Sequence, residues 1–141
     1  MRFVVDAPNG KSWFRLETEG EAAQESQLMR HAVEKYFRIE REKAVQSYQP
    51  ASRSFIEQDI GLKAHIQRAM PLFLTLRDQD GKAHVTAMLP PGGKADGGAR
   101  CIIVGPSNAD PYPSEGEAIK ALGAHFGLTL ERERCYPYQR G

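Results

Sequence analysis

Two dipeptides constrain the fold of this chain more than any other feature of its sequence. Asn9-Gly10 and Asp80-Gly81 each stand between two apolar segments. Asn-Gly and Asp-Gly supply the positive φ angles that a two-residue hairpin turn requires. The sequence therefore predicts two antiparallel β-hairpins, one within residues 2–17 and one within residues 72–89.

Each turn also determines which residues of its two strands face each other. The first turn pairs Val5 with Phe14 and Phe3 with Leu16, which gives one apolar face for packing. The second turn predicts a longer series of cross-strand pairs. These are Leu76 with Val85, Leu74 with Ala87, Leu72 with Leu89, Thr75 with Thr86, and Arg77 with His84.

Two Ser/Thr-x-x-Glu sequences indicate where helices begin, because the hydroxyl and the carboxylate of such a box satisfy reciprocal backbone donors. The box at residues 18–21 predicts a long helix whose apolar stripe continues to about Val45. The box at residues 114–117 predicts a shorter helix. Both segments carry acidic residues in the first turn, as the helix dipole favours.

Hydrophobic periodicity assigns the remaining segments. Continuous apolar residues at 101–104 predict a strand near the sheet centre, and alternation at 128–136 predicts a last strand at an edge. Residues 53–70 fit two periods: a possible cap at Ser54 favours a helix, whereas alternation from Ile60 onward favours a strand. We expect the strand, because four matches to a period of two outweigh one cap signal.

These elements together predict a single α+β domain over residues 1–141. Its mostly antiparallel sheet would be built from two β-hairpins plus further strands, packed by one long and one short helix. The length of 141 residues is enough to bury one hydrophobic core. The glycine-rich segment at 90–99 is expected to be a flexible loop.

Several functional classes leave signatures that this sequence lacks. Cys101 and Cys135 are too few for a disulfide framework and lack the spacing of a zinc site, so we expect buried thiols, with a bridge between them left open. The four histidines form no metal-binding pair, and the phosphate-binding glycine motifs and the serine nucleophile elbow are missing. No cofactor, metal or catalytic residue is therefore expected.

The charge balance argues against a nucleic-acid partner. There are 19 Lys and Arg against 18 Asp and Glu, which gives a net charge of +1 without the basic excess of nucleic-acid-binding proteins. A basic stripe on the first helix is interrupted by glutamates, which weakens this hypothesis further. Neither a signal peptide nor a membrane span is predicted, so a cytoplasmic location without membrane contact is expected.

The segment 105–114 is the candidate ligand site. It leaves the strand at 101–104 and enters a helix N-terminus, where backbone amides and the helix dipole favour an anion. The alternative is a proline-stiffened connector with local turns, and acidic residues in the first helical turn favour that alternative. The polar groups available to a ligand are Ser107, Asn108, Asp110 and Tyr112.

A candidate partner surface consists of Val4, Trp13, Phe73 and Met88, which we expect on one face of the two hairpins. If helices cover only the opposite face, these side chains form an exposed apolar patch for another protein or a second copy. The alternative is that the second helix covers them. We therefore expect a small, non-catalytic protein-interaction module, with a ligand-binding protein or enzyme using residues 105–114 as the alternative.

Overall fold

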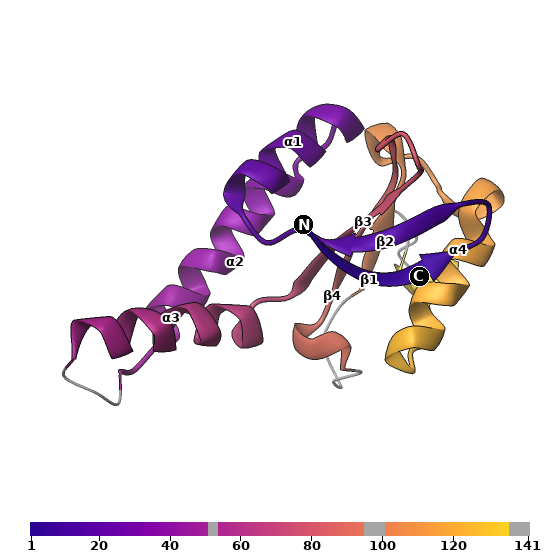
Figure 1. Ribbon diagram of the computed structural model, residues 1–141. Helices are drawn as coiled ribbons and strands as arrows, with labels where there is room; N and C mark the ends of the chain where they lie inside the picture. The colour runs from indigo at the N-terminus through magenta and orange to yellow at the C-terminus, as the bar shows by residue number, and fades with distance from the viewer. Residues whose placement is uncertain (51–53, 95–100, 136–141) are drawn as a thin grey trace.

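The computed structural model describes residues 1–50, 54–94 and 101–135 (Figure 1). Within these residues it has a five-stranded antiparallel sheet in the order β1-β2-β3-β4-β5 and five α-helices, so the α+β class is confirmed. The strands are β1 (Arg2–Ala7), β2 (Lys11–Arg15), β3 (Leu72–Arg77), β4 (Ala83–Leu89) and β5 (Ile102–Val104). The helices are α1 (Glu19–Met29), α2 (Val33–Ser47), α3 (Phe55–Ala69), α4 (Tyr112–Phe126) and α5 (Arg132–Cys135).

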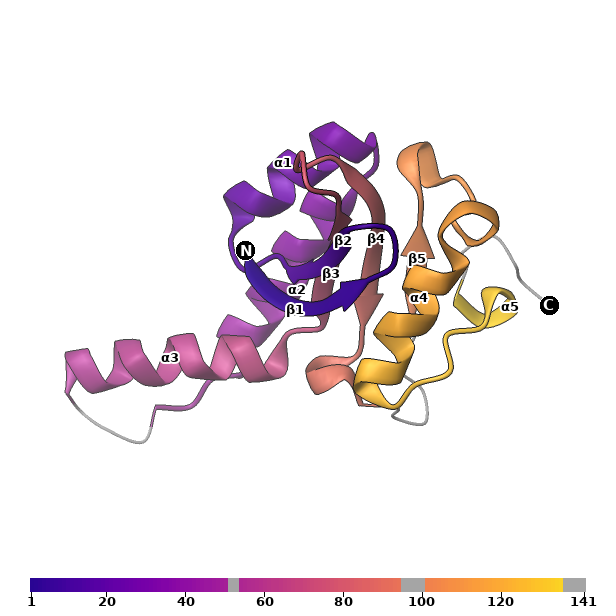
Figure 2. The same cartoon turned by 45° about the vertical axis from the view of Figure 1, so that its right-hand side comes forward.

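Helices cover both faces of the sheet. The α1–α2 pair lies against one face and α4 lies against the other (Figure 2). On the α4 side the core is formed around Trp13, whose indole Nε1 donates to the carbonyl oxygen of Ala118 at 2.8 Å. On the α1–α2 side Phe37 packs edge to face on Phe73, with ring centroids 5.2 Å apart.

The second hairpin has almost the register that its turn predicts. The pairs Leu72–Leu89 and Leu76–Val85, and those between them, are as expected, but Arg77 faces Ala83 instead of His84. The reason is an irregularity next to the turn, where Gly81 takes a φ of 80°. A glycine in the left-handed region with a local bulge is a common way to close a three-residue hairpin loop.

The first hairpin does not have its predicted register. The pairing differs by one residue near the turn, and a further shift follows between Val5 and Phe3. Val5 faces Trp13 instead of Phe14, and Phe3 faces Phe14 instead of Leu16. Asn9 and Gly10 do take the positive φ angles expected, but the loop between the paired ends contains three residues. A one-residue change reverses which side chains share a face, so Val5 lies on the same face as Trp13, which packs on the α4 side.

The predicted long helix is two helices. Its start is as expected, because Thr18 and Glu21 form the reciprocal capping box. The helix then ends at Arg30, which takes a left-handed φ of 55° and donates its N–H to Ser26. The chain resumes as α2 from Val33, so two shorter helices replace one long one.

The preference for a strand within residues 53–70 was wrong. Residues 55–69 form the helix α3, and Ser54 is its N-cap, with Oγ accepting a hydrogen bond from the backbone N–H of Glu57 at 3.4 Å, while residue 53 lies outside the described residues. The cap signal therefore predicted the correct element, and the alternation from Ile60 did not.

The C-terminal third also departs from expectation. The strand at 102–104 lies at an edge of the sheet, not at its centre. Helix α4 begins at Tyr112, two residues before the predicted cap at Ser114. The predicted strand at 128–136 is wrong over its described part, which ends in the short helix α5, while residue 136 lies outside the described residues.

The two cysteines are free thiols, with Cys135 buried and Cys101 partly buried.

The glycine-rich segment is described only in part. The start of the predicted 90–99 loop is a one-turn 3₁₀ helix in which Gly93 is buried, and a Cβ there would lie 2.3 Å from the ring of Phe126. Residues 95–100 of this segment lie outside the described residues.

Candidate functional site

The polar groups of the predicted ligand segment bind other parts of the chain. Asp110 accepts a hydrogen bond from the backbone N–H of Tyr112 at 3.0 Å and pairs with Arg132 of α5 at 2.5 Å. The hydroxyl of Tyr112 donates to the carbonyl oxygen of Leu130 at 3.0 Å, and burial raises the pKa of that phenol. Two of the four candidates therefore tie the C-terminal segment to the loop.

The other two candidates lie in a 3₁₀ turn at Pro106–Asn108. Ser107 and Asn108 both take positive φ angles, 56° and 61°. Gly105 donates its N–H to the carbonyl oxygen of Ala109 at 2.7 Å, which closes the turn. These are the local turns that the connector alternative predicts.

The four residues of the predicted partner patch do not come together. Val4 and Trp13 pack on the α4 side of the sheet, whereas Phe73 and Met88 pack on the α1–α2 side. Trp13 is 0% exposed and Phe73 is 2% exposed. Helices lie on both faces, so the structure has the alternative arrangement, in which helices cover these side chains.

A buried ionic network connects α1 to the second hairpin, and the sequence analysis did not identify it. Glu25 is 0% exposed; its Oε1 accepts from Arg77 Nη2 at 2.6 Å, and its Oε2 accepts from the Thr86 hydroxyl at 2.5 Å. Arg77 Nε also donates to Thr75 Oγ1 at 2.9 Å, and His31 Nε2 lies 2.8 Å from Thr86 Oγ1. Burial lowers the pKa of His31, against a smaller opposing effect of the Glu25 charge.

We interpret this network as part of the core that stabilises the fold and not as a ligand site. Every buried side-chain nitrogen and oxygen within the described residues has a hydrogen-bond partner. One signal for it was present in the sequence. Glu25 lies at helical spacing between Ala22 and Met29 on the stripe that faces the sheet, where an unpaired carboxylate would be costly.

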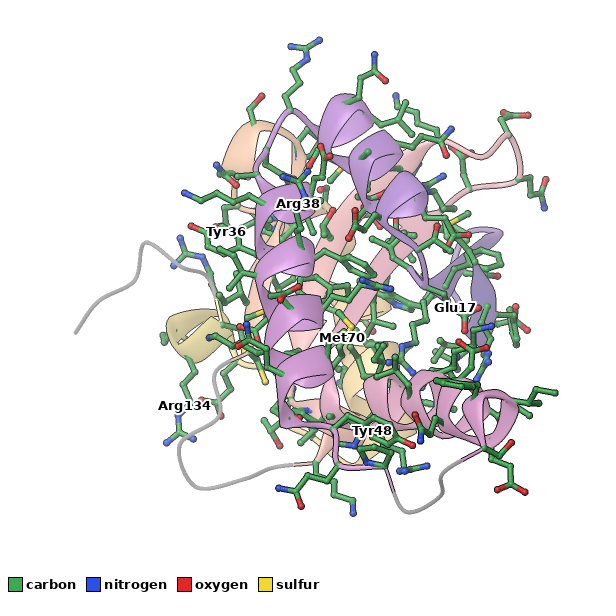
Figure 3. All side chains as sticks on the ribbon, turned by 90° about the vertical axis from the view of Figure 1, so that its left-hand side faces the viewer. Glu17, Tyr36, Arg38, Tyr48, Met70 and Arg134 are labelled. Carbon is green, nitrogen blue, oxygen red and sulfur yellow. The ribbon has the colours of Figure 1, made fainter. Side chains whose placement is uncertain are left out.

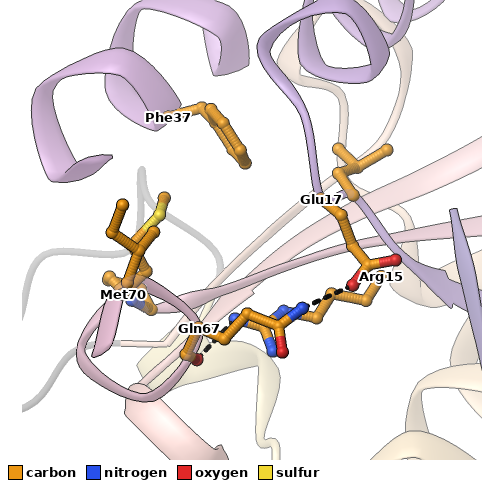
Figure 4. Close-up of a pocket in the computed structure, with 8 residues that line it drawn as sticks. Arg15, Glu17, Phe37, Gln67 and Met70 are labelled. Carbon is orange, nitrogen blue, oxygen red and sulfur yellow. Dashed lines mark hydrogen bonds between the residues drawn. The ribbon is translucent and has the colours of Figure 1, made fainter. Parts of the chain in front are cut away.

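A small pocket opens at the junction of β2, α2 and the C-terminal end of α3 (Figure 4). Its polar groups are already paired: Gln67 Nε2 donates to Glu17 Oε2 at 2.8 Å, and Arg15 Nη2 donates to the carbonyl oxygen of Gln67 at 2.9 Å. Burial lowers the pKa of the Arg15 guanidinium. The pocket residues are Arg15, Leu16, Glu17, Phe37, Ile66, Gln67, Met70 and Pro71, which we call the root pocket.

Helix α3 is the most unusual element of the fold. It projects from the body of the domain in both ribbon views (Figures 1 and 2), and we call it the arm. None of its fifteen residues, all of which the structure describes, is buried. Phe55 is 88% exposed, Ile56 is 74% exposed and Ile60 is 63% exposed. The end of the arm therefore presents large apolar side chains to solvent.

Contacts at its other end hold the arm in place. The Gln67 bonds join it to β2, and Ser47 Oγ of α2 lies 2.7 Å from His65 Nε2. A Cβ on Gly61 would lie 2.2 Å from the Tyr48 hydroxyl, so the absence of a side chain there allows Tyr48 to approach the helix. Figure 3, which shows the side from which the arm projects, places Tyr48 beside it.

Other exposed apolar side chains have a different setting. Leu28, Tyr36 and Ile39 lie on α1 and α2, whose opposite faces are buried in the core. Scattered exposed apolar residues on such helices are normal for a folded domain. The arm differs because its apolar residues gather at one end of a helix with no buried residue, which is typical of an interaction surface.

Comparison of the chain with models of known protein families, with curated proteins and with solved structures found no match. Among the described residues, no helix is both long and apolar enough to cross a membrane. In the same parts of the chain, no three or more His, Cys, Asp or Glu side chains are grouped so that they could hold a metal ion. The exposed apolar end of the arm makes it the candidate functional site.

Proposed function

We propose that this chain is a protein-interaction module that binds its partner through the arm. The observation that supports this proposal is the exposure of Phe55, Ile56 and Ile60 on a helix whose other end is held by hydrogen bonds. A short helix that packs against the domain only at one end, as the arm does through Ile66 and Ala69, is marginally stable in water, because helical stability in proteins comes mostly from packing. A partner that covers the arm would supply that packing.

The free energy gained by burying the exposed apolar side chains of the arm limits how tightly a partner can bind through them. Burying the three exposed side chains would contribute on the order of 5 kcal/mol. Association costs at least about 4 kcal/mol in lost translational and rotational freedom. The apolar residues alone would therefore give weak binding, and the polar residues around them must add complementary contacts.

Photocrosslinking tests whether a protein covers the arm. We expect a benzoylphenylalanine in place of Ile60 to form a crosslinked protein product in the cells that make this chain. The same substitution at Asp80, which is exposed in the turn between β3 and β4, is the matched control and should give none. Adding Ile56→Glu should remove the product from position 60, because a charge would replace an apolar contact.

Two outcomes would contradict the proposed function. One is the absence of any product from position 60, and the other is equal crosslinking from positions 60 and 80. The mass of a specific product also separates the possible partners, since a second copy gives twice the mass of the chain.

A further inference from the structure

We propose that the partner of the arm is a second copy of this chain, bound so that the two arms pack antiparallel about a two-fold axis near residue 61. This inference rests on the proposed function, and it adds the identity of the partner and the register of the contact.

Five exposed residues of the arm form one continuous stripe. Positions separated by three, four and seven residues share a face of an α-helix. This face lies away from Gly61 and His65, which contact Tyr48 and Ser47 of the same chain. The residues on it, which we call the arm stripe, are Ile56, Asp59, Ile60, Lys63 and Gln67, and all five are exposed.

The arm stripe is self-complementary in charge. Lys63 Nζ already lies 3.0 Å from Asp59 Oδ2 in the same helix. A two-fold axis at residue 61 places Asp59 of each copy opposite Lys63 of the other, because the two positions are equally far from the axis. Two such pairs then form one closed network of four alternating charges, as expected for an interface that uses the same patch on both copies.

The same axis brings the apolar residues together. Ile60 lies one residue from the axis, so the two Ile60 side chains meet at the centre of the contact. Ile56 of each copy then lies beside the aliphatic part of Gln67 of the other. Apolar contact at the centre with charged pairs around it is the usual arrangement of a protein interface.

The length of the arm places its free end at a specific site on the second copy. From residue 55 to residue 67 the helix rises about 18 Å. In the antiparallel arrangement Phe55 therefore reaches the level of Gln67, at the root pocket of the other chain, whose lining includes the partly exposed apolar side chain of Ile66. The most exposed aromatic ring of the arm would then contact an apolar surface.

Charge reversal tests the identity of the partner and the register together. We expect the wild-type chain to sediment as a dimer. Asp59→Lys alone and Lys63→Asp alone should each weaken the dimer at least about tenfold, because like charges then face each other across the axis. An equimolar mixture of the two variants should restore a dimer, and so should the double variant Asp59→Lys/Lys63→Asp.

Glu42→Lys is the matched control for net charge, because Glu42 is exposed on α2 outside the arm stripe, and this variant should remain dimeric. Circular dichroism establishes that each variant is folded. A wild-type chain that stays monomeric while position 60 crosslinks to a different protein would overturn this inference and leave the proposed function standing. Failure of both the mixture and the double variant to restore a wild-type dimer would overturn the antiparallel register.

Discussion

Glu25→Ala is expected to lower the free energy of unfolding by about 3–5 kcal/mol, because it leaves a buried guanidinium without its counter-charge. Arg77 is only 6% exposed and has Glu25 as its ion-pair partner. The hydroxyl of Thr86 would lose its acceptor at the same time. Urea denaturation followed by circular dichroism measures the change.

Two further variants separate loss of the charge pair from loss of packing. Replacing both partners, as in Glu25→Met/Arg77→Met, should recover much of the lost stability, since a buried ion pair can often be exchanged for apolar groups of similar volume. Glu42→Ala, at an exposed position of α2, should change stability by less than about 0.5 kcal/mol. A Glu25→Ala chain as stable as the Glu42→Ala chain would contradict the described burial of the pair.

Trp13→Ala is expected to lower the free energy of unfolding by a similar amount, about 3–5 kcal/mol, because it removes the largest side chain of the core. Trp13 joins β2 to α4 through its ring contacts and through the Nε1 hydrogen bond to Ala118. Both the packing and that bond are lost in the variant. Denaturation followed by circular dichroism avoids the loss of the single tryptophan as a fluorescent probe.

Trp13→Phe distinguishes the two contributions. It keeps an apolar ring but removes the indole donor to the Ala118 carbonyl oxygen, which lies within α4 and keeps its helical partner, so the lost hydrogen bond should cost about 0.5–1.5 kcal/mol. Equal stability of the phenylalanine variant and the wild type would show that the hydrogen bond contributes nothing. A small effect of the alanine variant would contradict the position of Trp13 in the core between β2 and α4.

The parts of the fold that were predictable depend on local chemistry. The capping box at Thr18 and the register near Leu74 follow from short-range backbone requirements that neighbouring residues satisfy. The fold class follows from the same signals. The break at Arg30 has no such signal, because left-handed residues at helix ends are usually Gly or Asn.

The arm was indicated only by its cap at Ser54, because its apolar spacing did not indicate a helix. A helix normally acquires its three-to-four-residue apolar spacing from the face that it buries. Helix α3 buries no residue, so packing within one chain places little constraint on where its apolar residues stand. The alternation from Ile60 therefore favours a strand instead. The sequence therefore predicts a partner surface on the sheet at Trp13 and Phe73, which α4 and the α1–α2 pair cover.

The most direct test of paired arms is disulfide formation from Ile60→Cys, because the two copies of residue 60 lie next to the proposed axis. Under mild oxidation this variant should give a disulfide-linked dimer, whereas Glu42→Cys at the same concentration, and the wild-type chain with its partly buried Cys101 and buried Cys135, should not. Equal yields of linked dimer from positions 60 and 42, or none from position 60, would contradict the paired arms.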